Sequence, residues 1–344
     1  MTRPLEDGSE QPLAAVHDVA LLDLDGVLYV GPDAVPGAPE AVAAAAAAGL
    51  RPAYVTNNAA RTPETVAEHL RALGVPADAT DVVTSAQAAA RLVAERVPAG
   101  SAVLVVGGDG LDAALTERGL VPVAEMADDV AAVVQGFAPE VGWRLLAEGT
   151  YAVAAGLPWI ASNLDATVPT AKGTAPGNGA LVGLVADAAG RRPDAVAGKP
   201  ETPLHRESVE RTGAERPIVV GDRLDTDIEG ANRAGTPSLL VLTGVCRPAD
   251  LLRAAAELRP TYLAADLRTG LLDPHPAVRS VDGGWQCGQA TVRVDGTDVT
   301  VDGATEDGTG RTDALRALCV AWWAAEAAEA DDEAVRSAVA AAGW

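Results

Sequence analysis

The sequence contains few aromatic residues, few cysteines and no long hydrophobic run. Aromatic residues make up 3% of the chain, so aliphatic side chains, alanine above all, must fill the core. The three cysteines (Cys246, Cys287 and Cys319) lack C-x-x-C spacing, and their odd number favours reduced thiols. No apolar stretch approaches membrane-spanning length, and the polar segment 1–12 does not resemble a signal peptide. We therefore expect a cytoplasmic protein.

Positive charge is also scarce. The formal net charge is −22, and only two residues, Lys172 and Lys199, are lysines. This balance argues against nucleic acid and against an anionic membrane surface as partners. An anionic substrate would need local cations to offset the field of the chain. The 344 residues exceed the usual size of one domain, so we expect two or three domains.

Asp23 and Asp25 follow the apolar run Val19–Leu22 directly. A short continuous apolar run is typical of a buried strand in a parallel sheet, and open α/β sheets bind ligands at the carboxyl ends of their strands. Residues i and i+2 of an extended segment point the same way, so both carboxylates could face one substrate. Two like charges so close need a cation or a shared proton. The alternative at this point is a strand end followed by a turn at Gly26.

Strand and helix signals alternate along most of the chain, which predicts an α/β fold with a doubly wound parallel sheet. A second α/β series in the middle indicates an inserted domain. The tail differs, because alternating segments around Asp295-Gly296 predict a hairpin and two alanine-rich helices follow it. The predicted strands are 19–24, 52–56, 82–84, 103–106, 131–135, 159–162, 218–220, 238–242, 291–294 and 298–301. The predicted helices are 40–48, 62–73, 109–118, 143–155, one from about 203, 313–329 and 332–341.

Three further polar clusters match what the acid pair would need. Thr56, Asn57 and Asn58 end a predicted strand, where a hydroxyl and backbone N–H groups can hold an oxyanion. Lys199 stands between a glycine and a proline. Asp222, with Asp225 and Asp227 after it, follows another apolar strand and suits a hard cation. Taken singly, these clusters could be an asparagine-rich turn, a solvated lysine and the acidic start of a helix.

The four clusters in order resemble the motifs of the haloacid dehalogenase superfamily: D-L-D-G-V-L, V-T-N-N, G-K-P and G-D-R-L-D-T-D-I-E-G-A. The paired asparagines and the stretch 221–235 are similar to subfamily IIA, the branch of p-nitrophenyl, phosphoglycolate, pyridoxal and glycerol phosphate phosphatases. The resemblance covers residues 18 to about 270. It implies a Rossmann-like catalytic core (1–85 and 197–270) and an inserted C2-type cap (86–196).

The resemblance also implies roles for individual residues. Asp23 would be the nucleophile that forms an aspartyl phosphate, and Asp25 the general acid and then the base. Mg²⁺ would be held by Asp23, the backbone carbonyl of Asp25 and Asp222, with Asp227 orienting Lys199 or a metal-bound water. Asp225 has no clear role, and we expect a solvated acid.

Phosphate and substrate binding are implied by the same resemblance. Thr56, the N–H groups of Asn57 and Asn58, and Lys199 would hold the phosphoryl oxygens. In the cap, candidates for specificity are Asn163, Asp165 and Asn178, for which Asx turns and a Gly/Pro loop are equally good explanations.

The tail (271–344) resembles the GNAT-like appendage of actinobacterial glycerol 3-phosphate phosphatases. The segment Glu306–Gly310 is similar to a pyrophosphate-binding glycine loop, but its acidic residues would repel phosphate. We therefore predict a small, non-catalytic α+β domain, with Trp322 and Trp323 packed against the core. Acetyl-CoA binding is the less favoured alternative.

The predicted function is Mg²⁺-dependent hydrolysis of a small phosphate monoester, with glycerol 3-phosphate as the favoured substrate. Alternatives are 2-phosphoglycolate, pyridoxal phosphate and p-nitrophenyl phosphate, or a phosphometabolite sensor without turnover. A dehalogenase is disfavoured, because it needs neither the second acid nor the Asp222 metal site. The predicted partner is the small-molecule ester, with neither nucleic acid nor membrane, and a homodimer is an open alternative.

Overall fold

The computed structural model describes residues 3–170, 172–303, 308–327 and 330–344. The chain forms two compact units, one of residues 1–52 with 214–344 and one of residues 53–213. The division falls within strand β4 (Arg51–Thr56). The domain boundaries predicted from the sequence, at 85/86, 196/197 and 270/271, stay a prediction.

A parallel sheet forms the centre of the first unit, with its strands in the order β15-β14-β13-β1. The residues of β1 and β14 are all buried, as expected for strands that are covered on both faces. These strands are β1 (Val19–Leu22), β13 (Pro217–Gly221), β14 (Ser238–Val241) and β15 (Tyr262–Ala264). The other elements of this part are α1 (Leu13–Val16), β2 (Tyr29–Val30), β3 (Asp33–Ala34), α2 (Ala38–Ala47), the π-helix η2 (Leu224–Ile228), α9 (Glu229–Ala234), α10 (Pro248–Leu252), η3 (Ala256–Leu258) and α11 (Leu267–Leu272).

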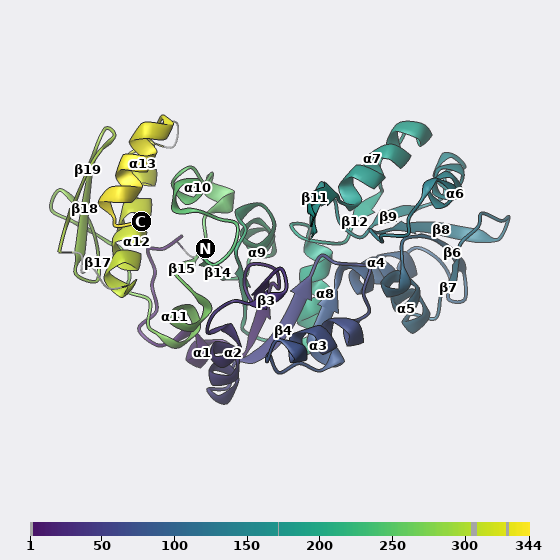
Figure 1. The fold of residues 1–344 in the computed structure, drawn as a ribbon, viewed down its shortest axis with the longest axis horizontal. Helices are drawn as coiled ribbons and strands as arrows, with labels where there is room; N and C mark the ends of the chain where they lie inside the picture. Colours follow the sequence, from purple (N-terminus) through teal and green to yellow (C-terminus); the bar gives the residue numbers. More distant parts are fainter. Residues whose placement is uncertain (1–2, 171, 304–307, 328–329) are drawn as a thin grey trace. The chain divides into compact units, whose positions relative to one another are not determined.

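The C-terminal part of the same unit is an antiparallel sheet, β16-β17-β18-β19, with two helices beside it (Figure 1). Asp295 pairs with Asp298, which confirms the predicted hairpin. The elements are β16 (Arg279–Val281), β17 (Gly284–Cys287), β18 (Ala290–Asp295), β19 (Asp298–Asp302), α12 (Gly308–Ala324) and α13 (Asp332–Ala341).

Helix α12 joins this appendage to the core of the unit. Trp322 and Trp323 are buried in one hydrophobic cluster with Leu251, which confirms their predicted packing. The indole Nε1 of Trp323 donates to the carbonyl of Leu251 (3.2 Å), and the Arg259 guanidinium stacks 4.5 Å from the Trp323 ring. The helix begins at Gly308, earlier than predicted, so the last residues of the suggested glycine loop are its first turn. Glu306 and Asp307 lie outside the described residues.

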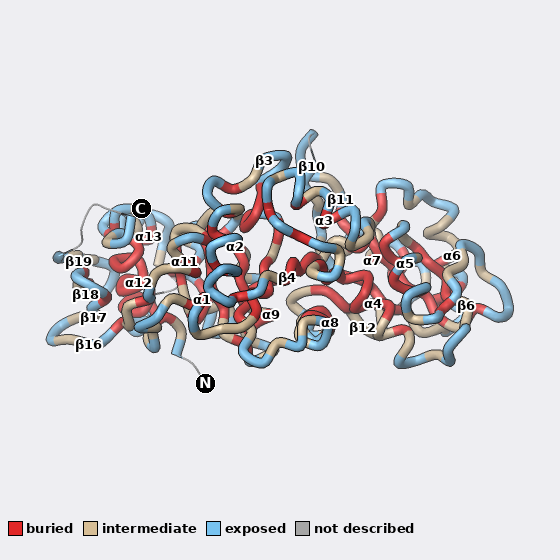
Figure 2. Tube along the Cα trace, turned by 90° about the horizontal axis from the view of Figure 1, so that it is seen from below, coloured by how far each residue is buried: buried red, intermediate tan, exposed pale blue. Residues whose placement is uncertain are grey.

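The second unit carries its own parallel sheet, in the order β12-β9-β8-β6-β7, and β4 pairs in parallel with β5. Helix α4 is buried along most of its length (Figure 2). The elements are α3 (Pro63–Ala72), η1 (Ala79–Asp81), β5 (Val82–Thr84), α4 (Ser85–Ala94), β6 (Ala102–Val106), α5 (Asp109–Glu117), β7 (Val121–Val123), β8 (Val130–Gln135), α6 (Trp143–Ala154), β9 (Trp159–Ala161), β10 (Thr167–Thr170), β11 (Gly173–Pro176), α7 (Asn178–Ala189), β12 (Ala195–Val196) and α8 (Thr202–Thr212).

A buried carboxylate ties α8 to two other helices of the second unit. The side chain of Glu207 is 1% exposed and accepts hydrogen bonds from Arg91, Arg118 and Arg211 at 3.1, 2.5 and 2.5 Å. Arg91 belongs to α4, and Arg118 directly follows α5. A buried charge is tolerated only when it is fully paired, so this cluster fixes where α8 packs.

Among the described helices, none is long and apolar enough to cross a membrane.

Cys246, Cys287 and Cys319 are all buried and free. Burial raises the pKa of the Cys246 and Cys287 thiols to about 12, so these side chains behave as small hydrophobic groups.

A buried polar cluster holds α12 against the edge strand β15. Arg316 donates to the carbonyl of Leu263 (2.9 Å), to Asp313 (2.7 Å) and to Nδ1 of His275 (3.0 Å). Because guanidinium is only a donor, Nδ1 must carry the lone pair, and Nε2–H then donates to the carbonyl of Gly270 (2.8 Å). Burial, together with the Arg316 charge, lowers the pKa of His275 to about 4.

This cluster predicts a loss of stability in mild acid. Below pH 6.5 the unfolded chain protonates His275, whereas the folded protein does so only near pH 4, so stability falls as the pH drops through this window. Between pH 7 and pH 5 the loss should be about 2 kcal/mol. Urea unfolding of wild type and His275→Gln at both pH values measures it, and the variant should show a pH dependence smaller by that amount. Equal pH dependence in the two proteins would contradict the burial of a neutral histidine.

Candidate active site

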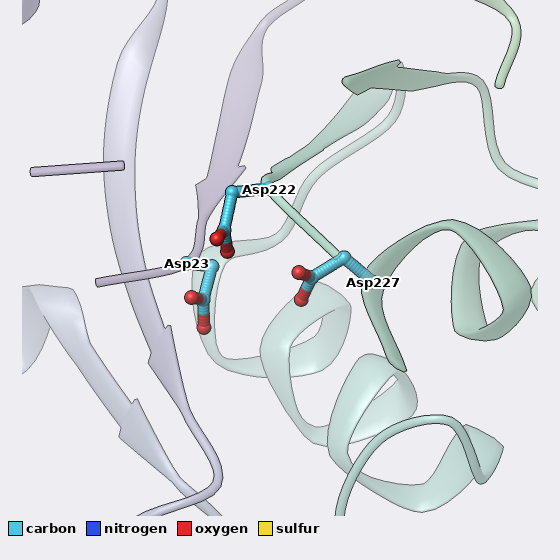
Figure 3. Close-up of side chains that lie close together, drawn as sticks. All are labelled: Asp23, Asp222 and Asp227. Carbon is cyan, nitrogen blue, oxygen red and sulfur yellow. The ribbon is translucent and has the colours of Figure 1, made fainter. Parts of the chain in front are cut away.

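Three aspartates meet at the carboxyl edge of the first unit's sheet (Figure 3). Asp23 directly follows β1, Asp222 directly follows β13, and Asp227 lies in the short π-helix η2. One carboxylate oxygen from each lies within 4.8 Å of the others. Asp222 and Asp227 are 0% and 1% exposed, and Asp23 is half-buried. The family resemblance implied that Asp23 and Asp222 bind one metal ion. The parallel pairing of β1 with β13, in which Leu22 lies beside Val220, brings the two residues to the same edge of the sheet.

Backbone N–H groups orient these carboxylates. The N–H of Val245 donates to Oδ2 of Asp222 (2.6 Å), and the N–H of Arg223 donates to Oδ2 of Asp227 (3.2 Å). The N–H of Asp23 donates to the carbonyl of Val220 (2.8 Å), which extends the β1–β13 ladder by one residue. Each acid is therefore held from the main chain of a strand end or of the loop that follows it.

Two glycines leave the space that the Asp222 carboxylate occupies. A Cβ atom at Gly26 would lie 2.3 Å from Oδ2 of Asp222, and one at Gly244 would lie 1.9 Å from the same oxygen. Gly26 also has a φ of +85°, which other residues rarely adopt. The hydroxyl of Thr243 fixes the two loops together by donating to the carbonyl of Gly26 (2.6 Å).

The chain turns sharply directly after the first acid. Strand β1 ends at Leu22 rather than at the predicted Leu24, because the Leu24 carbonyl accepts the N–H of Leu28 (2.9 Å) and closes a turn. Asp25 therefore lies in the turn and is exposed, and the hydroxyl of Tyr29 donates to its Oδ2 at 3.4 Å. The extended i, i+2 geometry expected for Asp23 and Asp25 is thus replaced by a strand end and a turn.

The donor set of the aspartate cluster fits a small divalent cation. Three carboxylates within 4.8 Å repel one another, and burial of two of them removes the water that would screen this repulsion. Carboxylate oxygens are the ligands that Mg²⁺ prefers. Asp23 and Asp222 would hold the ion, and Asp227 is close enough to bind it or to orient a bound water.

Asp225, the remaining acid of this segment, is not one of the three clustered carboxylates. Its carboxylate pairs with the Arg223 guanidinium at 3.0 and 2.7 Å, and its side chain is 64% exposed. The bonds from Arg223 lower the pKa of Asp225. The exposure of Asp225 agrees with the expectation of a solvated acid, and the structure adds an ion pair with Arg223.

Thr56 and Asn58 form a tight turn at the end of β4, in the second unit. The N–H of Asn58 donates to Oγ1 of Thr56 (3.0 Å), and Oδ1 of Asn58 accepts the N–H groups of Ala60 and Arg61 at 2.9 and 3.2 Å. Thr56 is 5% exposed. The Asn58 side chain therefore closes an Asx turn, which was one of the two readings that the sequence left open.

The structure brings Asn57, Lys199 and Asp165 together within the second unit. Nδ2 of Asn57 donates to the Asp165 carboxylate at 3.2 and 3.3 Å and to the Lys199 carbonyl at 3.1 Å. Lys199 Nζ donates to the carbonyl of Val55, in β4, at 3.3 Å. Residues from three distant segments thus share one hydrogen-bonded cluster.

The two other cap candidates are buried beside that cluster. Asn163 and Asn178 are 4% and 1% exposed. Nδ2 of Asn163 donates to the carbonyl of Asn57 (2.7 Å), and Nδ2 of Asn178 donates to the carbonyl of Asn163 (2.7 Å). Asn178 begins helix α7 rather than lying in a loop, with Gly177 as its N-cap.

Sequence reasoning missed Tyr29, Ser85 and the segment Thr243–Val245. The segment Thr243–Val245 could have been suspected, because it begins two residues after the end of β14, the strand next to β13, and starts with a Thr-Gly pair. Ser85, whose hydroxyl donates to the carbonyl of Asn57 (2.6 Å), had no such signal.

Models of three protein families together match most of the chain. Residues 20–121 match the model of haloacid dehalogenase-like hydrolases, and residues 196–270 match a HAD-hydrolase-like model. Residues 287–344 match a GCN5-related N-acetyltransferase-like domain.

The relatives and solved structures that match include proteins named as phosphatases. The D-glycerol 3-phosphate phosphatase of Mycobacterium tuberculosis is 42% identical over 341 residues, which cover 95% of this chain and 94% of that protein. An acid sugar phosphatase of Staphylococcus aureus is 37% identical over 255 residues, 74% of this chain and 96% of that protein. The crystal structure of the glycerol phosphate phosphatase from M. tuberculosis in complex with magnesium has a TM-score of 0.84 at 41% identity, covering 96% of this chain and 98% of that one.

The space at Gly244 provides a test of the metal site. In Gly244→Ala the new methyl group would displace the Asp222 carboxylate, so we expect Mg²⁺ to bind at least about tenfold more weakly. Mg²⁺ titration followed by the shift in melting temperature measures the affinity without any substrate. Gly183→Ala in α7 is the control, since a Cβ there meets nothing within 4 Å, and it should leave Mg²⁺ binding unchanged. Equal Mg²⁺ affinity in Gly244→Ala and wild type would refute the role given to Asp222.

Proposed function

Because the chain belongs to the haloacid dehalogenase-like hydrolases, we propose that it is a Mg²⁺-dependent phosphatase that hydrolyses glycerol 3-phosphate. The observation that carries the proposal is the cluster of Asp23, Asp222 and Asp227 at the carboxyl edge of a parallel sheet. Such an edge is where α/β folds bind ligands, and the acids offer both a nucleophile and metal ligands.

The choice of substrate rests on similarity along the whole chain. The M. tuberculosis D-glycerol 3-phosphate phosphatase aligns over 95% of the chain, so the alignment includes the C-terminal appendage. The acid sugar phosphatase aligns over 74%. An enzyme that shares the appendage is the better guide to the substrate. The alternatives are 2-phosphoglycolate, pyridoxal phosphate and p-nitrophenyl phosphate.

The proposed reaction has two steps, each of which uses one acid of the pair. A carboxylate oxygen of Asp23 attacks phosphorus, and the bond to the substrate oxygen breaks while Asp25 gives that oxygen a proton. Asp25 then takes a proton from water, which attacks phosphorus and releases inorganic phosphate and the free Asp23 carboxylate. Asp25 suits the second role because it is exposed in its turn, where water reaches it.

The negative charge of the phosphoryl group must be offset by local positive charge, because the chain as a whole is strongly acidic and would repel it. Mg²⁺ would supply two positive charges and polarise the phosphoryl oxygens when it is bound by Asp23, Asp222 and the Asp25 carbonyl. We propose that Thr56, the N–H groups after it and Lys199 bind the equatorial oxygens. Asp227 would orient a metal-bound water.

The cap residues and the appendage complete the proposal. We assign substrate selection to the loop that carries Asn163 and Asp165, with Asn178 supporting it, because the side-chain amides of both asparagines hold its main chain. The appendage is proposed to be structural, because its helix α12 shares a hydrophobic core with β14 and α10 of the same unit. The three buried free thiols support a reducing compartment such as the cytoplasm. A homodimer stays a prediction.

Asp23→Asn should abolish turnover, because a neutral amide does not attack phosphorus. Phosphate release from glycerol 3-phosphate should fall by at least about 10³-fold. Asp225→Asn is the matched control, since it makes the same substitution at an exposed acid paired with Arg223, and its rate should stay near that of wild type. Substantial turnover by Asp23→Asn would disprove the covalent mechanism.

A panel of esters tests the substrate. We expect kcat/KM to be highest for glycerol 3-phosphate among that compound, 2-phosphoglycolate, pyridoxal phosphate and p-nitrophenyl phosphate, and activity to disappear with EDTA and return with Mg²⁺. A higher value for another ester would reassign the substrate and leave the chemistry in place. Binding of these esters without phosphate release would instead identify a sensor.

A further inference from the structure

The side-chain amide of Asn57 forms hydrogen bonds with both the backbone N–H and the backbone carbonyl of Lys199. Its Oδ1 accepts the N–H of Lys199 at 2.8 Å, and its Nδ2 donates to the carbonyl of Lys199 at 3.1 Å. This is the pair of bonds that one residue of a strand exchanges with its partner. Asn57 therefore fixes both the position and the orientation of the Lys199 backbone, although 142 residues separate the two in sequence.

Asn57 is itself held by two other segments of the second unit. Its carbonyl accepts the hydroxyl of Ser85, the first residue of α4, at 2.6 Å and Nδ2 of Asn163 at 2.7 Å. Asn163 in turn is held through its own carbonyl by Asn178 at 2.7 Å. Hydrogen bonds thus connect Asn57 directly to the first residue of α4 and to the loop after β9, and through that loop to the first residue of α7.

The side chain of Asn57 has no donor left for a substrate. An asparagine amide offers two N–H groups, and these are used by the Lys199 carbonyl and the Asp165 carboxylate, the latter at 3.2 and 3.3 Å. A direct bond from this amide to a phosphoryl oxygen would require one of them to break. Only the backbone N–H of Asn57 can serve phosphate without that loss.

Close approach of the two segments depends on Gly198. A Cβ there would lie 2.5 Å from Oδ1 of Asn57 and 2.7 Å from the carbonyl oxygen of Ser162. The residue before Lys199 is therefore packed against the same amide that holds Lys199. Beyond this backbone contact, the Lys199 ammonium donates to the carbonyl of Val55 (3.3 Å), near the end of β4.

We propose that Asn57 is a positioning residue that acts on phosphate transfer through Lys199. The Asn57 amide fixes the main chain from which the Lys199 side chain extends. The ammonium group therefore starts from a fixed backbone position, and this backbone does not have to move during phosphate transfer. Preorganised charge is worth most where it meets the charge of the transition state, and a displacement of about 1 Å costs on the order of 10²-fold in rate. This inference rests on the proposed phosphatase function.

A double-mutant cycle tests whether Asn57 works through Lys199. We expect Asn57→Ala to lower kcat/KM for glycerol 3-phosphate by about 30- to 100-fold, mostly in kcat. In a Lys199→Ala background the same change should cost no more than about twofold, because the charge that it positions is already gone. Equal costs in the two backgrounds would overturn the proposal and would assign Asn57 an independent contact with substrate.

Two further variants separate positioning from folding. Asn57→Asp keeps the acceptor for the Lys199 N–H but turns a carboxylate oxygen toward the Lys199 carbonyl and Asp165, so it should be at least as impaired as Asn57→Ala. Asn232→Ala is the control, because Asn232 also bridges two carbonyls, those of Glu257 and Arg259, in the other unit. Its kcat/KM should stay within about twofold of wild type. Wild-type activity in Asn57→Asp would refute the positioning role of Asn57.

A structural measurement decides the inference even if the enzyme acts on none of the esters. Amide hydrogen exchange at Lys199 should be slow in wild type and at least about tenfold faster in Asn57→Ala, with the protection of β8 unchanged. An unchanged exchange rate of the Lys199 amide would overturn the proposal that Asn57 holds the Lys199 backbone. A wild-type protein without phosphatase activity but with the expected exchange would reject the proposed function and keep the backbone contact.

Discussion

The repulsion among Asp23, Asp222 and Asp227 is the constraint on which the rest of the site depends. Their carboxylates lie within 4.8 Å, and two of them are shielded from water. Backbone N–H groups offset part of that charge at Asp222 and Asp227, but partial charges cannot balance three carboxylates. Clustered carboxylate oxygens are the ligands that a small divalent cation such as Mg²⁺ prefers, and the ion would supply two positive charges at once. The chemistry of the three acids therefore points to a divalent cation independently of any relative.

The same constraint explains the glycines around the cluster. A carboxylate that binds an ion must be held without its neighbours covering its oxygens, and backbone is the most compact neighbour available. Gly26 and Gly244 approach Asp222 so closely that any side chain would occupy the place of its carboxylate. The site is thus built from main chain on one side, and its shape depends on residues that carry no chemistry of their own.

Much of this arrangement could be predicted from the sequence, because its parts lie at the ends of regular elements. Buried strands such as β1 and β13 are continuous apolar runs, and the carboxyl ends of neighbouring parallel strands share one edge. Some short elements were missed, among them β15 (Tyr-Leu-Ala), whereas β5 of the same length was predicted because all three of its residues, Val-Val-Thr, are β-branched. Helix α4 was missed although Thr84 and Gln87 form a capping box at its start.

The contact between Asn57 and Lys199 could not be predicted, and the reason is physical. A side chain that bonds to main chain far away in the sequence leaves no periodicity and needs no particular neighbours, and its partner depends on how two loops pack. The sequence indicates that Asn57 and Lys199 are polar residues at element ends, and chemistry suggests that both meet phosphate. The structure separates the two roles, because both donors of the Asn57 amide are used by Lys199 and Asp165, and one of these bonds would have to break before the amide could bind the substrate. In a chain this acidic, fixing the backbone of one of only two lysines is an efficient way to place positive charge.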